Sequence, residues 1–266
     1  MTVAAGSPMG QAKESARAAG LRWVDDSVPG ITREGKPGHF SYRDAGGGVV
    51  KDAATLQRIA EIVIPPAWTD VWICASPNGH IQATGRDARR RKQYRYHPGW
   101  REVRDERKYD RMLAFGQSLP SIRERVERDL RSSGLSRERV LAAVVRLLDV
   151  TFIRVGNNEY AKENNSFGLT TLRNRHVDIQ GSTINFRFKG KSGVRHTVTL
   201  QDARLARILD RCQDLPGEEL FEWVDDQGEP HVIGSDDVNQ YLREMTGQEF
   251  TSKDFRTWAG TVLALC

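Results

Sequence analysis

The feature that most constrains the fold is a change of hydrophobic period between Val150 and Val198. The residues up to Arg154 read as the end of an apolar helix that runs into a polar turn. From Ile184 onward apolar and polar side chains alternate, and a period of two is typical of a β-strand. Residues 190–193, Gly-Lys-Ser-Gly, are a turn signal that joins this strand to the next. The stretch therefore predicts a helix end that carries Arg154 and a β-hairpin tip that carries Lys191. Two cations on two rigid elements suit an anion, and a phosphodiester is the obvious candidate.

The composition, with 38% hydrophobic and 28% charged residues among 266, is that of a soluble globular protein. No run of 18 apolar residues occurs, so we expect no membrane-spanning helix. The first 20 residues have no apolar signal core, and we expect a disordered leader there in a cytoplasmic, nucleoid-associated protein. Three scattered cysteines form no CxxC pair, which argues against a disulfide framework and against a metal site.

The positive charge of the chain is concentrated in one short region. The formal net charge is +5, but residues 86–111 alone contain eleven Lys or Arg and five Asp or Glu. The rest of the chain is therefore close to neutral. An excess confined in this way is typical of a polyanion-binding surface, although a solvated charged face would give the same pattern.

Residues 21–100 read as a small β-rich domain. Asn78-Gly79 is a strong hairpin signal, and Asp52 is a plausible N-cap for a short helix before it. Tyr94 and Tyr96 are two residues apart, so on a strand both rings lie on one face, where they could contact bases or sugars. Ordinary aromatic packing is the alternative.

Residues 101–266 read as a mainly α domain that carries the β-hairpin, which makes the fold class α+β. We expect helices over 102–117, 121–131, 136–150, 202–212 and 235–245. Ser136 could cap the third of these helices, and Ser235 is the expected N-cap of the last. A further helix starts near Thr251 and carries Arg256.

Several ordered motifs resemble the catalytic domain of type IB DNA topoisomerases, in particular the poxvirus-like and bacterial branch. The motifs are Ile153-Arg154-Val155-Gly156-Asn157, Tyr160-x-Lys162-Glu163-Asn164, Gly168-Leu169-Thr170-Thr171-Leu172, Phe188-x-Gly190-Lys191 and Asp254-Phe255-Arg256-Thr257-Trp258. They occur in the family's order, and the resemblance covers roughly residues 20–266. It implies an enzyme that relaxes supercoiled duplex DNA through a transient 3′-phosphotyrosyl link, with no cofactor, ATP or metal.

The resemblance also implies roles for individual residues. Arg154 and Arg256 would bind the non-bridging phosphate oxygens, and Lys191 would be the general acid. The implied DNA contacts are Arg86, Lys92, Tyr94, Tyr96 and Arg104. The partner would be double-stranded DNA, held by a monomer that closes around it.

Each of the three central cations also has an ordinary structural alternative. Arg154 could neutralise a helix C-terminus, and Lys191 could be a solvent-exposed turn lysine. Arg256 could pair with Asp254 or Glu249.

One departure from the family pattern concerns the nucleophile. The family continues past the helix that carries Arg256 to a tyrosine, whereas the last tyrosine here is Tyr241, on the preceding helix. We therefore expect a truncated chain that binds DNA without cleaving it and leaves apolar surface exposed. The alternatives are a non-catalytic DNA-binding protein of the same family, a tyrosine recombinase, or a basic α+β protein without a DNA role. The N-terminal β-rich domain argues against the recombinase.

Overall fold

The computed structural model describes residues 8–265, which fall into two compact units, Met1–Tyr109 and Asp110–Cys266. We call these unit 1 and unit 2 and describe each by itself. The helix α3 (Pro98–Asp129) begins in unit 1 and continues in unit 2. The division between the two units falls within α3, after Tyr109, and the domain boundary near residue 100 stays a prediction.

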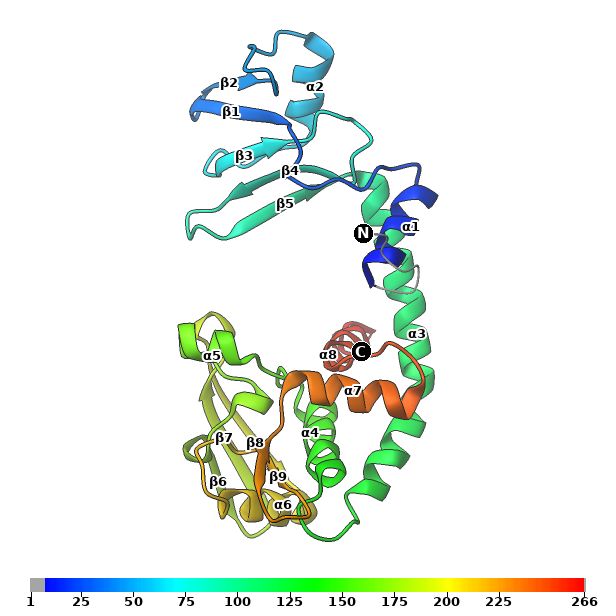
Figure 1. Cartoon of the computed structure of the whole chain (residues 1–266), viewed down its shortest axis with the longest axis vertical. Helices are drawn as coiled ribbons and strands as arrows, with labels where there is room; N and C mark the ends of the chain where they lie inside the picture. Colours follow the sequence, from blue (N-terminus) through cyan, green and yellow to red (C-terminus); the bar gives the residue numbers. More distant parts are fainter. Residues whose placement is uncertain (1–7, 266) are drawn as a thin grey trace. The chain divides into compact units, whose positions relative to one another are not determined.

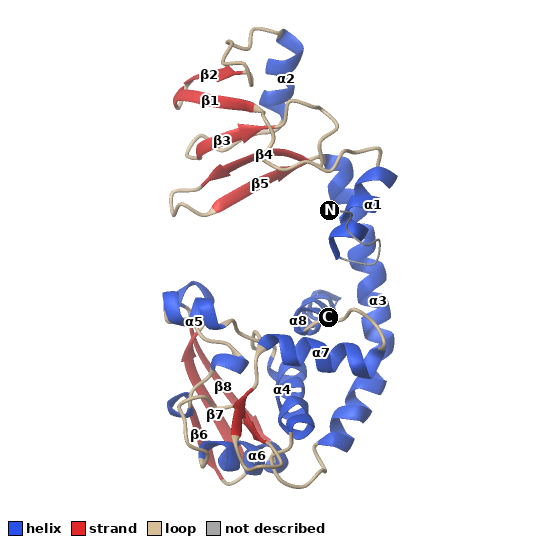
Figure 2. Cartoon of the chain, viewed as in Figure 1, coloured by secondary structure: helices blue, strands red, loops and turns tan. Residues whose placement is uncertain are grey.

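Unit 1 is built on one antiparallel sheet with the strand order β2-β1-β3-β4-β5 (Figure 2). The strands are β1 (Ile31–Lys36), β2 (His39–Arg43), β3 (Thr69–Ile73), β4 (Ile81–Arg86) and β5 (Lys92–Tyr96). The helix α2 (Ala53–Glu61) packs on the sheet through Ile59, which is buried with Ile73 and Ala83. Asp52 caps this helix as predicted, because its side chain accepts a hydrogen bond from the Thr55 amide at 2.8 Å.

The expectation of a disordered leader fails from Pro8 onward; residues 1–7 lie outside the described residues. Pro8–Ala18 form the helix α1. Its Ala16 is buried in a small cluster with Leu21 and Trp100. The segment is mostly polar, and the residues that pack it against the cluster are small alanines such as Ala12 and Ala16, so its sequence carries little sign of a buried helix.

The two helices predicted on either side of Pro120 are one continuous helix, α3. Proline removes a backbone donor and normally ends a helix. Here a stripe of buried side chains continues past it, formed by Phe115, Leu119, Ile122 and Val126. Packing of that stripe outweighs the local cost of the proline.

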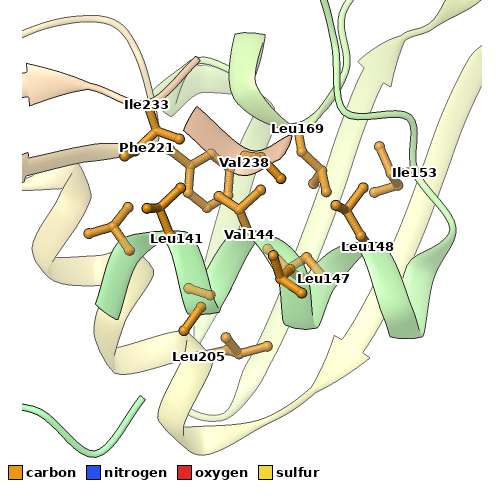
Figure 3. Packing of buried hydrophobic residues seen from close by; sticks show 14 of the residues in the cluster. Leu141, Val144, Leu147, Leu148, Ile153, Leu169, Leu205, Phe221, Ile233 and Val238 are labelled. Carbon is orange, nitrogen blue, oxygen red and sulfur yellow. The ribbon is translucent and has the colours of Figure 1, made fainter. Parts of the chain in front are cut away.

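Unit 2 is organised around the helix α4 (Arg137–Thr151), which Ser136 caps as predicted. Its residues 140–145, 147 and 148 are all buried, so the helix is covered on every side. Figure 3 shows Leu141, Val144 and Leu148 meeting side chains such as Phe221 and Leu169 that arrive from other segments. The helices that contact it are α6 (Ala203–Gln213), α7 (Ser235–Thr246) and α8 (Ser252–Leu265), while the short helix α5 (Asn158–Asn164) lies apart from it (Figure 1).

The β-structure of unit 2 is larger than one hairpin. Strands β7 (Thr183–Lys189) and β8 (Arg195–Gln201) form the predicted hairpin, and β6 (Val177–Gln180) extends it to a three-stranded sheet. A separate ribbon pairs β9 (Glu222–Val224) with β10 (Pro230–Val232). The α+β class is confirmed. The N-cap of α7, however, is Gly234 rather than Ser235, because Asp237 accepts the Gly234 amide. Within residues 8–265 no helix is long and apolar enough to cross a membrane.

Replacement of Leu148 by alanine should remove about 2–5 kcal/mol from the free energy of unfolding of unit 2. The side chain is fully buried at the centre of the core, so the cavity cannot be filled by water or by a small shift. The matched control is Leu263→Ala on α8, where the side chain is 70% exposed and the expected change is within about 0.5 kcal/mol. Urea unfolding followed by circular dichroism measures both; equal losses in the two variants would contradict this description of the core.

Candidate active site

Arg154 follows a helix end that is fixed by its backbone. After α4 ends, Phe152 adopts the left-handed conformation with φ of 55°, and its amide donates to the Leu148 carbonyl at 3.3 Å. The Arg154 carbonyl then accepts from the Leu169 amide at 2.8 Å, and the Val155 carbonyl accepts from the Thr170 amide at 2.7 Å. These bonds hold the backbone while the Arg154 side chain stays exposed.

A close backbone approach explains one glycine of the resemblance motifs. A Cβ atom on Gly168 would lie 2.5 Å from the Arg154 carbonyl oxygen and 2.6 Å from the Gly156 amide nitrogen. Only glycine allows the two segments to lie this close.

Arg256 reaches the same place from α8. Its Nη1 donates a hydrogen bond to the carbonyl of Phe152, two residues before Arg154. Burial lowers the pKa of Arg256, and the positive charge of Arg154 lowers it further. The contact with Phe152 holds the Arg256 guanidinium group beside the backbone that leads into Arg154. No ion pair found among the described residues neutralises either arginine. Two unneutralised cations on one backbone framework are suited to an anion with several oxygens.

The pairing of Arg256 with Asp254 or Glu249, which the residues alone left open, does not occur. Asp254 is instead paired with Arg111 of α3, at 2.7 Å from Oδ1 to Nε.

Lys191 lies at the tip of the β7–β8 hairpin, as predicted. The pairing of Lys189 with Arg195 closes the ladder, and the Gly190 amide donates to the Val194 carbonyl at 2.7 Å. The Lys191 side chain is exposed. The hairpin is tied to the Arg154 segment, because the Phe167 amide donates to the Lys189 carbonyl at 2.8 Å next to Gly168. The structure thus brings Arg154 and Arg256 together and joins Lys191 to the same framework, without a direct contact between Lys191 and either arginine.

The residues implied to contact DNA in unit 1 form a row. Tyr94 and Tyr96 stack on one face of β5, with ring centroids 5.9 Å apart and planes inclined by 13°. Arg104 lies 5.4 Å from the Tyr96 ring centroid, and the Lys92 ammonium lies 5.7 Å from that of Tyr94. The two stacked rings thus have a cation at each end, Lys92 beside Tyr94 and Arg104 beside Tyr96, which suits a phosphate backbone beside sugars or bases. Arg86 lies on the neighbouring strand β4, opposite Lys92, and its Nε is 3.6 Å from the carboxylate of Asp70.

Asp26 is a residue of this surface that the sequence patterns missed. Its carboxylate lies 2.6 Å from the Lys92 ammonium, and this hydrogen bond raises the pKa of Lys92 and lowers that of Asp26. No local motif links Asp26 to a lysine so distant in the chain. The Asp26 carboxylate neutralises the positive charge of Lys92 when no other anion is bound.

Replacement of Lys92 by glutamine should weaken binding of any duplex by a similar factor and reduce the slope of log K against log salt by about one. The reason is that a phosphate contact releases about one counterion whatever the base sequence. Fluorescence anisotropy at several salt concentrations measures the slope. Lys51→Gln removes the same charge from an exposed position of unit 1, and a slope change as large in that control would contradict a specific contact.

Tyr241 is a structural residue. It is 2% exposed, and its hydroxyl donates to Asp129 Oδ2 at 2.6 Å. Burial raises its pKa, and the hydrogen bond to Asp129 raises it further, so the phenol stays protonated. Its hydroxyl is buried and bonded to Asp129, so it is not presented to a phosphodiester. Tyr241→Phe should cost about 1–2 kcal/mol of stability and leave duplex affinity unchanged, as thermal melts and anisotropy would show. Unchanged stability with lost affinity would contradict this role.

The described residues contain no group of three or more His, Cys, Asp or Glu arranged to hold a metal ion. The groups that the structure does bring together at the site are the two guanidinium groups, with the hairpin lysine on the adjoining loop.

A family model described as the catalytic core of eukaryotic DNA topoisomerase I matches residues 97–265, and one for the N-terminal domain of bacterial DNA topoisomerase IB matches residues 39–87. DNA topoisomerase 1B of Acanthamoeba polyphaga mimivirus is 33% identical over 239 residues, which are 88% of this chain and 71% of the viral protein. DNA topoisomerase 1B of vaccinia virus (strain Copenhagen) is 29% identical over 52% of this chain, and the matched part is 44% of that protein's length. A solved structure of the XerH site-specific recombinase bound to its difH substrate covers 56% of this chain and 42% of that chain at 12% identity, with a TM-score of 0.38.

Proposed function

Because this chain belongs to the type IB DNA topoisomerase family, we propose that its Arg154, Lys191 and Arg256 act together on one phosphodiester of duplex DNA. The reaction is the relaxation of supercoiled DNA by transient cleavage of one strand. The observation that carries the proposal is the hydrogen bond from the Arg256 guanidinium group to the Phe152 carbonyl, which holds Arg256 at the backbone segment that carries Arg154. The proposal also agrees with the positions of Arg154, Lys191 and Arg256 in the family motifs.

The arginines stabilise the charge that develops during the reaction. When a nucleophile adds to phosphorus, the non-bridging oxygens gain negative charge, and fixed cations that need no reorganisation lower the barrier most. The planar fork of arginine can donate to two oxygens at once. Arg154 and Arg256 arrive from different elements and so can bind different faces of the phosphate group.

Lys191 completes the step by supplying a proton. A tyrosine hydroxyl of the enzyme attacks phosphorus and loses its proton to solvent, which forms the 3′-phosphotyrosyl bond while the bond from phosphorus to the 5′ oxygen breaks. The leaving 5′ oxygen takes a proton from the Lys191 ammonium. The 5′ hydroxyl later attacks the phosphotyrosine and reverses each bond change, so the bond energy is conserved and no ATP is consumed. Tyr241 is excluded as this tyrosine by its burial and its hydrogen bond.

The row formed by Lys92, Tyr94, Tyr96 and Arg104, together with Arg86, contacts the duplex in this proposal. The cations bind backbone phosphates, and the tyrosine rings lie against sugars or bases. A monomer is sufficient, because both sets of residues belong to one chain, and the protein acts at the nucleoid within the cytoplasm.

The experiment that tests the proposal is relaxation of negatively supercoiled plasmid in EDTA without ATP. It compares this chain with a form extended at its C-terminus to the length of its relatives. Relaxation by at least one form is the expected result. Relaxation by neither form, or relaxation that requires ATP or a divalent metal, would contradict the proposal.

A further inference from the structure

An ion pair joins the helix α3 to the first turn of α8, two residues before Arg256 in the chain. Arg111 donates two parallel hydrogen bonds to Asp254, each 2.7 Å long, from Nε to Oδ1 and from Nη2 to Oδ2. The same guanidinium donates to the Glu249 carbonyl and lies 5.7 Å from the ring centroid of Phe250. A two-point contact of this kind fixes direction as well as distance.

The Asp254 carboxylate also holds the start of α8 together. Its Oδ2 accepts from the Thr251 amide at 2.7 Å and from the Thr251 hydroxyl at 3.0 Å. Burial alone would raise the pKa of Asp254, but the hydrogen bonds from Arg111 and Thr251 outweigh it and hold the pKa below its usual range. The carboxylate is therefore charged and bonded to two elements at once.

Packing next to the ion pair prevents α8 from turning about its axis. The rings of Phe115 and Phe255 meet edge to face, with centroids 5.0 Å apart. Gly116 allows α3 to lie against Trp258, since a Cβ atom there would be only 2.4 Å from the indole ring. Residues 254 and 256 lie on nearly opposite sides of a helix. Because Asp254 faces α3, Arg256 lies on the exposed side of α8.

We propose that Arg111 and Asp254 are positioning residues that set where Arg256 presents its guanidinium group. The ion pair fixes the first turn of α8 to α3. The Phe152 carbonyl accepts a hydrogen bond from the Arg256 guanidinium group itself. This inference rests on the proposed function, in which Arg256 binds the phosphodiester. Neither Arg111 nor Asp254 needs to touch DNA.

The test is duplex binding by the full chain carrying Asp254→Asn, measured by anisotropy over a range of salt. The substitution makes the chain one charge more positive, so charge alone would strengthen binding. Positioning predicts the opposite sign: an affinity loss of about tenfold and a salt slope smaller by about one, as for Arg256→Gln. In an Arg256→Gln background, Asp254→Asn should have no further effect on affinity.

Asp237→Asn is the matched control. Asp237 also accepts an amide at the start of a helix and pairs at 2.7 Å with an arginine of another helix, Arg137, but it lies on α7 and not on the helix of Arg256. Its affinity should stay equal or increase. If Asp254→Asn unfolds the chain in thermal melts, Arg111→Lys replaces it, because lysine keeps the charge and loses the two-point contact.

The outcomes distinguish failure of the positioning role from failure of the proposed function. Loss with Arg256→Gln but none with Asp254→Asn or Arg111→Lys overturns the positioning inference and leaves the proposed function intact. Losses that add fully in the double variant also overturn it, since they would show that Asp254 acts independently of Arg256. No loss with Arg256→Gln removes the assigned role of Arg256, and the inference falls with it.

Discussion

Lys191→Ala is expected to slow plasmid relaxation by about 10²–10⁴-fold while duplex affinity changes by no more than about threefold. The expected loss is large because the 5′ oxygen is a poor leaving group unless it is protonated as the bond breaks. Affinity should change little because one exposed lysine at a hairpin tip contributes little to an interface of many phosphate contacts. Initial relaxation rates under saturating enzyme measure the first effect, and anisotropy measures the second.

Lys189→Ala is the matched control for this prediction. It removes the same charge from the end of β7, where the backbone carbonyl that receives the Phe167 amide is retained. Its relaxation rate should stay within a few-fold of the unsubstituted chain. Equal losses in Lys189→Ala and Lys191→Ala would show that the hairpin charge acts collectively and would contradict a specific acid at its tip.

Arg256→Ala is expected to lower the relaxation rate by about 10²–10³-fold, the usual effect of removing one preorganised donor from a charged transition state. The structure gives a reason to expect that lysine cannot replace it. Arg256 uses one nitrogen for the Phe152 carbonyl, and its planar fork leaves further donors for the phosphate. A lysine ammonium group that keeps the hydrogen bond to the Phe152 carbonyl has fewer donors left for the phosphate. Arg256→Lys should therefore relax plasmid at most about tenfold faster than Arg256→Ala.

Arg154→Ala should show a loss of the same order, and the double variant should lose less than the product of the two single losses. Non-additivity is expected because, in the proposed function, both guanidinium groups bind one phosphate group. Single-turnover cleavage rates measure the cycle. Fully multiplicative losses would show that the two arginines act at separate phosphates and would contradict a common site.

Periodic patterns in the sequence predicted the elements that carry the site. The apolar run before Arg154, the alternation before Lys191 and the capping signal at Ser136 all became the expected helix and hairpin. These signals are local, and they succeed because burial of one face imposes a period on the chain. The helix α3 shows the limit, because long-range packing around Phe115 and Ile122 carries it through Pro120.

The contacts that orient the site could not be predicted in the same way. The Phe152 carbonyl that receives Arg256 belongs to the backbone and has no sequence signature. Arg111 and Asp254 meet only because α3 and α8 pack together, although they are far apart in the chain. Asp26 reaches Lys92 for the same reason. The motif resemblance identified the three central cations, and the structure supplies the neighbours that position them.

One measurement separates the roles of the lysine and the arginines most directly. It is the single-turnover cleavage rate of a duplex in which sulfur replaces the bridging 5′ oxygen at the cleaved phosphodiester, using whichever form of the chain relaxes plasmid. A thiolate leaves without protonation, since its conjugate acid is far stronger than an alcohol. Lys191→Ala should cleave this substrate at close to the rate of the unsubstituted chain, whereas Arg154→Ala and Arg256→Ala should remain slow. A Lys191→Ala defect that persists with the sulfur substrate, or arginine defects that disappear, would contradict these roles.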